Sequence, residues 1–392
     1  MTTPTTPTKT AAPPATPADA RTGTLRDAAL ALPGPARLAA LTLLLLPPGG
    51  LIAAVVSLCT PDPHHPVPVS ARALGSGETF KALERHLDAN LPGRDAVIGV
   101  VNTARYLTTR GGSDEVTLGA GGWLFLRSEL AAPPRQAAHL RERADLIADL
   151  NRDLQRRGVT LLVAVSPNKS RVQAAQLPGG ALPGWTTNTY ADFQALLRGR
   201  GVHSVDLLTP MQRAARTDAQ YYRTDTHWNQ DGARTAAQAT AQAIRALAPD
   251  LPPTAFTTSA APTAPRPGDL LHLMGLQVTP DALRPHADTE ATETTVAAGG
   301  DLGGGLLGDA PQVLLAGTSY GLRGNYHGAL QQALGSAVLN VSREGADFSG
   351  SLRPALRDPA FQAAPPRVLV WELPERFLPL PLDEEDHIPL AP

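Results

Sequence analysis

A long amphipathic segment followed by an unbroken apolar run does most to limit the fold of this chain. Arg135 to Arg157 carries apolar residues at helical spacing and ends at Gly158, a common C-cap residue. The next stretch, Val159 to Val165, is apolar apart from one threonine, as expected of a strand buried on both faces of a sheet. A polar loop, Ser166 to Ser170, follows it. This order is typical of an α/β sheet, in which ligands bind beyond the carboxyl ends of the strands.

The same pattern of helices and buried strands continues along the chain. Further strands are predicted at residues 202–206, 312–316, 337–341 and 367–371, and further helices at residues 78–87, 94–107, 190–198 and 231–246. A hairpin is predicted around the glycines of residues 116–126. Residues 247–266 and 279–310 carry few strand signals and are predicted to be loops. We therefore expect an α/β fold with a mostly parallel sheet.

Bulk properties exclude several classes of function. The chain has 392 residues and 42% hydrophobic side chains, enough for one large domain or two smaller ones. Its formal net charge of −2 provides no basic surface for nucleic acid. The single cysteine, Cys59, excludes an intrachain disulfide framework and a zinc site of the CxxC type.

The N-terminal region predicts a membrane anchor. Residues 1–37 begin with Thr, Pro and Ala repeats and are predicted to form a disordered cytoplasmic tail. Residues 38–59 carry no charge, and a transmembrane helix needs roughly 20 apolar residues. Basic residues precede this run, so the positive-inside rule places the rest of the chain outside the cytoplasm. Residues 60–77 are predicted to be a linker.

Three alternatives to an uncleaved anchor remain open. Pro47 to Gly50 interrupt the apolar run and would either kink the helix or mark a shorter, cleaved signal. Lipid attachment at Cys59 is disfavoured by the bulky Leu58 that precedes it. The run would also suit a buried helix of a soluble domain.

Residues Tyr221 to Asn229 place an acid and a histidine close together. In an extended segment the side chains of residues i and i+2 point to the same side. Asp225 can therefore orient the imidazole of His227 and leave its other nitrogen free as a base. A capping Asp and a surface His would show the same local pattern. A metal site built from this pair and a distant ligand such as His272 lacks the usual ligand spacing and is disfavoured.

Ser319 supplies the nucleophile that this pair lacks. It follows the strand predicted at residues 312–316 and has glycines on both sides, so its hydroxyl is expected on a sharp turn. Backbone N–H groups of the turn would stabilise an oxyanion. The backbone N–H of Ser319 is the first candidate for such a donor. The pattern differs from the GxSxG elbow, and an ordinary loop would carry the same residues.

Six segments, taken in order, resemble the alginate O-acetyltransferase family of the AlgX/AlgJ type, which has an SGNH-hydrolase-like domain. They are Gly122 to Phe125, Pro167 to Lys169, Thr224 to Trp228, Gly268 to Gly275, Gly317 to Tyr320 and Trp371 to Arg376. The Asp-Thr-His-Trp and Glu-x-Pro-Glu-Arg elements are the most specific parts. The resemblance implies a three-layer α/β/α SGNH-hydrolase-like domain over residues 78–378, followed by a C-terminal tail at residues 379–392.

The resemblance also implies a role for each residue of the reactive set. Ser319 would be the nucleophile, His227 its base and Asp225 the residue that orients the base. The family more usually has Gly-Asp-Ser where this chain has Gly317-Thr318-Ser319, so the role of that carboxylate does not carry over.

Further residues are candidates for substrate binding or for the oxyanion hole. They are Gly317, Thr318, Tyr320, Lys169, Arg323, Trp228 and Arg376. A structural role is the alternative for several of them: core packing for Trp228, and an ion pair with Glu372 for Arg376.

The function implied by the resemblance is the transfer of acetyl groups onto an exported or cell-envelope polysaccharide through an acetyl-serine intermediate. The catalytic domain would lie on the periplasmic side of the cell membrane, and a multi-pass membrane O-acyltransferase would deliver the acetyl donor. No cofactor, metal or nucleic acid is expected. Two alternatives remain open: an esterase that removes acetyl groups with the same residues, and a non-catalytic scaffold that binds polysaccharide.

Overall fold

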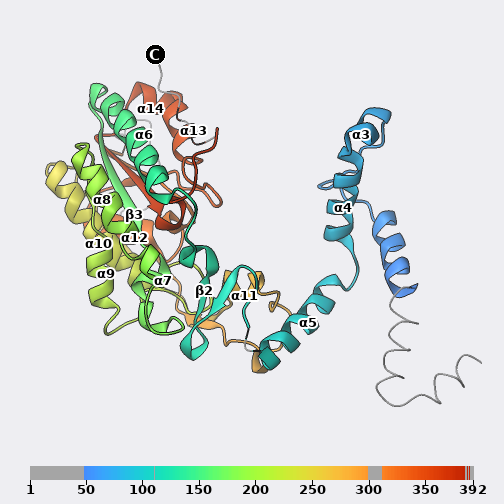
Figure 1. The fold of residues 1–392 in the computed structure, drawn as a ribbon. Coiled ribbons are helices and arrows are strands. Elements are labelled where there is room, and N and C mark those ends of the chain that lie inside the picture. The colour runs from blue at the N-terminus through green and yellow to red at the C-terminus, as the bar shows by residue number, and fades with distance from the viewer. Residues whose placement is uncertain (1–47, 110, 299–310, 385, 387, 389–392) are drawn as a thin grey trace, which may run out of the picture. The chain divides into compact units, whose positions relative to one another are not determined.

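The computed structural model describes residues 48–109, 111–298, 311–384, 386 and 388 (Figure 1). Its internal contacts divide the chain into two units, Met1–Arg94 and Asp95–Pro392.

The described part of the first unit is helical. A helix at residues 48–59 is followed by α3 (Ala71–Ser76) and α4 (Glu78–Asn90), so the predicted linker at residues 60–77 contains a short helix. Among the described residues, no helix is both long and apolar enough to cross a membrane. The predicted tail at residues 1–37 and residues 38–47 of the predicted anchor lie outside the described residues.

The second unit is built on a five-stranded sheet in the order β10-β9-β11-β3-β4. All four pairings between neighbouring strands are parallel. The strands are β3 (Thr160–Ser166), β4 (His203–Val205), β9 (Val313–Ala316), β10 (Val338–Asn340) and β11 (Val368–Pro374). Each of the five segments predicted to be a buried strand therefore forms a strand of this sheet, and the predicted mostly parallel sheet is confirmed.

Helices cover both faces of this sheet (Figure 1). Alternate residues of β3 point to opposite faces, with Leu161 and Val163 on one side and Leu162 and Ala164 on the other. The first face packs against α6 (Gln136–Arg156), α8 (Thr189–Gly199), α13 (Leu352–Arg357) and α14 (Pro359–Ala363). The second packs against α9 (Leu208–Ala214), α10 (Gln230–Leu247) and α12 (Tyr326–Leu334). The three-layer α/β/α arrangement is therefore present.

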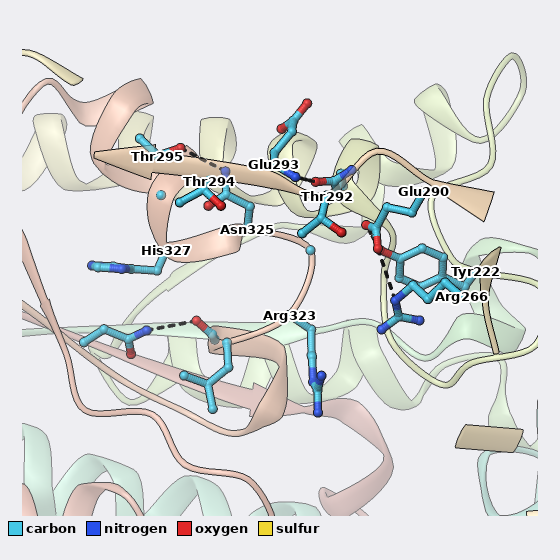
Figure 2. Close-up of a pocket in the computed structure, with 16 residues that line it drawn as sticks. Tyr222, Arg266, Glu290, Thr292, Glu293, Thr294, Thr295, Arg323, Asn325 and His327 are labelled. Carbon is cyan, nitrogen blue, oxygen red and sulfur yellow. Dashed lines mark hydrogen bonds and ion pairs between the residues drawn. The ribbon is translucent and has the colours of Figure 1, made fainter. Parts of the chain in front are cut away.

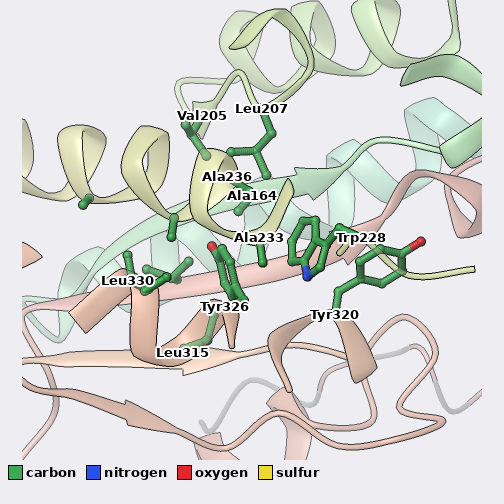
Figure 3. Close-up of a cluster of buried hydrophobic side chains, with 14 of the residues drawn as sticks. Ala164, Val205, Leu207, Trp228, Ala233, Ala236, Leu315, Tyr320, Tyr326 and Leu330 are labelled. Atoms are coloured by element: carbon green, nitrogen blue, oxygen red, sulfur yellow. The ribbon is translucent and has the colours of Figure 1, made fainter. Parts of the chain in front are cut away.

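Three aromatic rings fill the second face next to the carboxyl ends of the strands (Figure 3). The ring centroid of Trp228 lies 4.9 Å from that of Tyr320 and 4.9 Å from that of Tyr326. All three side chains are buried. This cluster connects the loop before α10 to the turn after β9, and these two segments carry the candidate catalytic residues.

Two small antiparallel ribbons correct the prediction that residues 247–266 and 279–310 are loops. In one ribbon β5 (Phe256–Ala260) pairs with β8 (Glu293–Ala297), and in the other β6 (Ala264–Arg266) pairs with β7 (Asp288–Glu290). These strands are short and largely exposed, so they lack the apolar alternation that marks a buried strand. Residues 299–310 lie outside the described residues.

The other described elements include a hairpin, three further helices and the C-terminal segment. The predicted hairpin is present as β1 (Val116–Leu118) and β2 (Leu124–Leu126). The predicted helix at residues 94–107 is α5 (Arg94–Thr109), while α7 (Lys169–Val172) and α11 (Asp269–Leu273) are short. The segment predicted to be a C-terminal tail packs on α6, where Arg143 Nη2 donates to the backbone oxygens of Leu380 at 3.3 Å and Pro381 at 3.0 Å.

Candidate active site

Ser319, His227 and Asp225 meet at the carboxyl end of the sheet. Ser319 begins a 3-10 turn just after β9, and its Oγ lies 2.7 Å from His227 Nε2. His227 Nδ1 lies 2.6 Å from Asp225 Oδ1, and the same carboxylate oxygen accepts the backbone N–H of His227 at 2.9 Å. The spacing expected of a nucleophile, a base and an orienting carboxylate is therefore present.

The charges around Asp225 keep it ionised. Burial by itself would raise the pKa of this carboxyl group. The hydrogen bonds and charge of His227 and the charge of the Arg266 guanidinium oppose that effect and hold the pKa well below its usual range. Arg266 Nη1 donates to Asp225 Oδ2 at 2.8 Å, so both carboxylate oxygens have partners. The ionised carboxylate can therefore accept a hydrogen bond from the Nδ1–H of His227 throughout the neutral pH range.

Side chains from residues 266–290 hold the loop that carries Asp225 and His227. Asp288 accepts the backbone N–H groups of Arg223 and Thr224, each at 2.9 Å. Asp269 accepts the backbone N–H of Thr226 at 2.7 Å and its hydroxyl at 2.5 Å. A Cβ atom at Gly268 would lie 2.0 Å from the Thr224 carbonyl oxygen, so only glycine allows this close approach.

The buried carboxylate of Glu372 holds the turn that carries the nucleophile. Its Oε2 accepts the backbone N–H of Thr318 at 2.7 Å and the Thr318 hydroxyl at 2.9 Å, while Oε1 accepts the Ser166 hydroxyl at 2.5 Å. Burial raises the pKa of Glu372, although these hydrogen bonds oppose the effect. Threonine suits position 318 in this chain because its hydroxyl donates to Glu372, whereas a second carboxylate there would repel it. A Cβ at Gly317 would lie 2.7 Å from Glu372 Oε2.

The turn offers one backbone donor for an oxyanion. The N–H of Tyr320 is bonded to the Thr318 hydroxyl at 3.3 Å, and the N–H of Gly321 to the Thr318 carbonyl at 3.0 Å. The N–H of Ser319 has no hydrogen-bond partner within the described part of the chain. It is therefore available as an oxyanion donor, in agreement with the sequence-based expectation.

Two of the motifs seen in the sequence meet beneath the site. The buried Glu375 carboxylate, just after β11, accepts the backbone N–H of Asn168 at 2.9 Å, just after β3. It also accepts two donors of the buried Arg171 guanidinium, Nε at 2.9 Å and Nη2 at 2.5 Å. Such a two-point pair fixes geometry as well as charge. The Glu-x-Pro-Glu and Pro-Asn-Lys segments therefore join the ends of two neighbouring strands.

Lys169, a candidate for substrate contact, is fully buried. Its Nζ donates to the backbone oxygens of Arg223 and Asp225, each at 2.9 Å, and lies over the rings of Trp123 and Phe125. Burial lowers the pKa of Lys169 to about 8, although nearby carboxylates such as Glu129 oppose the shift. Lys169 therefore supports the loop that carries Asp225 and His227, and it has no access to a ligand.

The depressed pKa of Lys169 predicts a pH-dependent contribution to stability. Between pH 8 and 10.5 the unfolded chain binds a proton at this site that the folded chain does not, so folding becomes more favourable as the pH rises. The free energy of unfolding of the wild type, minus that of Lys169→Met, should increase across this window by on the order of 3 kcal/mol. Urea unfolding at several pH values measures this difference.

A matched variant separates this effect from general alkaline behaviour. Lys81→Met removes an exposed lysine of α4, and urea unfolding of this variant over the same pH range is the reference for the loss of a surface lysine. A difference for Lys169→Met that varies with pH no more than that of Lys81→Met would contradict the assigned burial of the ammonium group.

The other candidate residues fall into two groups. The first group consists of Tyr320, Trp228 and Arg376, whose side chains contact other protein groups at the site. The Tyr320 hydroxyl donates to the Thr226 carbonyl at 2.8 Å and accepts from Arg376 Nη1 at 3.3 Å. Trp228 is fully buried, so its ring has no face for a sugar. Arg323 is half exposed and pairs with Glu344 at 2.7 Å, and among these described candidates it is the most exposed side chain.

Two cavities share Arg266 and Arg323 as lining residues, and the second of them is also lined by Asp225 and His227. The first, of about 460 Å³, is lined mainly by uncharged polar side chains such as Thr292, Thr294 and Asn325. Figure 2 shows Tyr222, Glu290 and Arg266 grouped at one end of it. The second, of about 560 Å³, is lined by His227, Asp225 and Asp269 and by charged groups that include Arg284 and Glu344. A ligand at His227 would therefore lie in the second cavity, and the first cavity adjoins it at Arg266 and Arg323.

Asp225, His227 and Asp269 also form a group with metal-ligand atoms, all within 4.8 Å of one another. The contacts favour a hydrogen-bonded site over a metal site. The Asp225 carboxylate already accepts from both His227 and the cationic Arg266, and Asp269 accepts two donors from Thr226. A metal ion bound at Asp225 would have to compete with the guanidinium group.

Several functional contacts could not be found from the sequence. Arg266 lies in a segment predicted to be a loop, and no local motif marks it. Asp269 belongs to the Gly-Asp-Leu segment that carried the family resemblance, which was its only signal. Glu372 was considered as a partner of Arg376, whereas its contacts with Thr318 and Ser166 show that it holds the nucleophile turn.

Comparison with known proteins places this geometry in a family. A family model described as an SGNH hydrolase-like domain, acetyltransferase AlgX, matches residues 116–375. A probable alginate O-acetylase AlgJ from Pseudomonas aeruginosa is 35% identical over 323 residues, which cover 79% of this chain and 82% of that protein.

Solved structures agree with this assignment. The O-acetyltransferase domain of Pseudomonas putida AlgJ is 35% identical and superposes with a TM-score of 0.62, covering 69% of this chain and 94% of that domain. AlgX of Pseudomonas aeruginosa superposes with a TM-score of 0.51 over 66% of this chain and 62% of that protein, and its 22% identity supports the fold alone. The chain therefore belongs to the family of O-acetyltransferases with an AlgX-type, SGNH-hydrolase-like domain.

Proposed function

We propose that this chain transfers acetyl groups onto an exported or cell-envelope polysaccharide through an acetyl-serine intermediate. The observation that carries the proposal is the hydrogen-bonded series Ser319 Oγ, His227 and Asp225, with steps of 2.7 Å and 2.6 Å. Relatives that share 35% and 36% identity with this chain are named as probable alginate O-acetylases, so alginate or a similar acidic polysaccharide is the proposed acceptor.

The first half of the reaction acetylates the enzyme. His227 Nε2 removes the proton from Ser319 Oγ as this oxygen attacks the acetyl carbonyl carbon of the donor. The resulting oxyanion accepts a hydrogen bond from the backbone N–H of Ser319. The bond to the donor's leaving group then breaks, and His227 gives its proton to that group. Asp225 stabilises the positive charge that His227 carries between these two transfers.

The second half moves the acetyl group to the sugar. A sugar hydroxyl attacks the acetyl-serine carbonyl while His227 Nε2 takes its proton, and Ser319 leaves and recovers a proton from His227. Water competes with the sugar for the same intermediate. Ser319 is only 7% exposed and His227 only 8%, which limits the access of water, and the two polar cavities provide space for sugar units.

The location and the donor partner form a further part of the proposal. The uncharged residues 38–59 and the basic residues before them support a single membrane anchor with the catalytic domain on the periplasmic side. A multi-pass membrane O-acyltransferase is proposed to deliver the acetyl donor, because acetyl groups activated in the cytoplasm must cross the membrane to reach this site.

Competition between water and sugar tests the proposed function. The full-length chain in detergent is given p-nitrophenyl acetate with increasing amounts of oligomannuronate. We expect acetylated oligosaccharide by mass spectrometry, and a falling share of free acetate as the acceptor concentration rises. Acetate release that the acceptor never diverts would support the esterase alternative. Oligosaccharide binding without turnover of the ester would support the scaffold alternative.

A further inference from the structure

Arg266 contacts the catalytic carboxylate on the side opposite His227. Asp225 Oδ1 faces the His227 ring, while Asp225 Oδ2 accepts from Arg266 Nη1 at 2.8 Å. Arg266 is the last residue of β6, and its side chain is only 21% exposed. The hydrogen-bonded series that begins at Ser319 and passes through His227 and Asp225 therefore continues to the Arg266 guanidinium.

Three groups hold the Arg266 guanidinium in place, and Figure 2 shows two of them, Glu290 and Tyr222. Besides its contact with Asp225, its Nε lies 3.2 Å from Glu290 Oε2, and its Cζ lies 3.9 Å from the centre of the Tyr222 ring. The Tyr222 hydroxyl in turn donates to Glu290 Oε1. Arg266, Glu290 and Tyr222 therefore form a closed cycle of contacts. Arg266 could reach a ligand only by giving up its contacts with Asp225 or Glu290.

The strand pairing places Arg266 next to a second contact with the loop that carries Asp225 and His227. In the β6–β7 ribbon Arg266 pairs with Asp288, the residue that accepts the backbone N–H groups of Arg223 and Thr224. The ribbon therefore holds the catalytic loop at its backbone through one strand and at its carboxylate through the other. A fork-shaped guanidinium can contact Asp225 and Glu290 together, which a lysine ammonium group cannot do with the same geometry.

We propose that Arg266 is a positioning residue for acetyl transfer: it fixes the Asp225 carboxylate against His227 and places a positive charge beside that carboxylate. The proposal rests on the function proposed above. Two effects follow from the same contact. Loss of the guanidinium lets the carboxylate rotate, which lowers kcat. It also removes a nearby positive charge, which makes the imidazolium form more stable and moves the acidic limb of the pH profile to higher pH.

Other charged or titratable groups around His227 must stay unchanged for this comparison. Asp269 Oδ2 lies 3.7 Å from His227 Nδ1, and the Tyr320 ring centre lies 5.0 Å from that of His227. The remaining groups are Asp225, Lys169 at the Asp225 carbonyl, Glu290 behind Arg266, Arg376 at the Tyr320 hydroxyl, and His272, Arg284, Arg323 and Glu344 in the adjoining cavity. A substitution confined to Arg266 leaves all of them in the chain.

The test compares pH profiles of variants in the full-length chain with p-nitrophenyl acetate as donor. Arg266→Met should lower kcat by about 10–100-fold, as is usual when a partner that orients a reactive group is lost, with little change in KM. Its acidic limb should move to higher pH by on the order of one unit. Arg266→Lys keeps the charge, so its kcat should also fall while its acidic limb stays near that of the wild type.

Arg234→Met is the matched control. Arg234 also bridges two carboxylates, Glu293 at 2.6 Å and Asp231 at 2.7 Å, but it touches no member of the triad. Both its kcat and its pH profile should match the wild type. Thermal unfolding of each variant shows whether the fold is kept. If Arg266→Met does not fold, the kcat of Arg266→Lys relative to the wild type decides whether the proposal stands.

Three outcomes would overturn the proposal. One is wild-type kcat with an unshifted profile in Arg266→Met. Another is wild-type kcat in Arg266→Lys. The third is a large rise in KM for an acidic oligosaccharide with kcat unchanged, because this would make Arg266 a substrate-binding residue. A Ser319→Ala sample run in parallel separates these results from a failure of the proposed function, since retained turnover in that variant would remove the serine mechanism itself.

Discussion

In the Ser319→Ala variant, acetyl transfer is expected to fall by about 10⁴–10⁶-fold, because the side chain that carries the acetyl group is absent. The Ser319 Oγ is the atom that faces His227 Nε2 at 2.7 Å, and alanine leaves His227 without a proton to remove. Turnover of p-nitrophenyl acetate gives the rate. Intact-protein mass spectrometry after brief mixing should detect an acetyl adduct on the wild type and none on the variant.

A second serine beside the nucleophile turn provides the control. The Ser342 Oγ is buried and has no hydrogen-bond partner within the described residues, and a Cβ at Gly321 would lie 2.2 Å from it. Ser342→Ala should therefore keep the wild-type rate and the acetyl adduct. If folded Ser319→Ala transferred acetyl groups as fast as the wild type, Ser319 would not be the nucleophile, and the polysaccharide-binding scaffold would become the leading interpretation.

The sheet and the reactive residues could be predicted because both leave local signals. Val159 to Val165 is apolar apart from one threonine, and it forms nearly all of β3, Thr160–Ser166, with both faces covered by helices. Asp225 and His227 are two positions apart, and the carboxylate does bond the imidazole, although residues 223–227 form bends and not the extended segment on which that prediction rested. Glycines around Ser319 marked its turn. In each case the feature depends on residues that are close together in the sequence.

The contacts that hold the site could not be predicted because they join distant segments. The β6–β7 ribbon pairs residues 264–266 with residues 288–290, and its polar, exposed strands look like loop in sequence. Arg266 therefore gave no sign that it would reach Asp225. The role of Lys169 stayed open between substrate contact and structural support for a related reason: only the fold shows the carbonyl groups that enclose its ammonium group.

The second large effect is expected from Asp225→Asn, which should slow acetyl transfer by about 10⁴-fold, as the same change does in serine protease triads. In the wild type, Asp225 Oδ1 accepts the Nδ1 proton of His227, which leaves Nε2 free to accept from Ser319. An asparagine amide that donates to Nδ1 would favour the opposite tautomer, with the proton on Nε2. It would also lose the ion pair with Arg266. Turnover of p-nitrophenyl acetate at neutral pH measures the loss.

Asp269→Asn is the matched comparison, because Asp269 is the other carboxylate near the imidazole. Its Oδ2 lies 3.7 Å from His227 Nδ1, and its hydrogen bonds go to Thr226, so its loss should loosen the loop and cost far less activity than Asp225→Asn. Equal losses in the two variants, together with inactivation of the wild type by a chelator, would contradict the triad and favour a metal held by Asp225, His227 and Asp269. A large loss confined to Asp225→Asn, with no effect of the chelator, is what a carboxylate that selects the His227 tautomer requires.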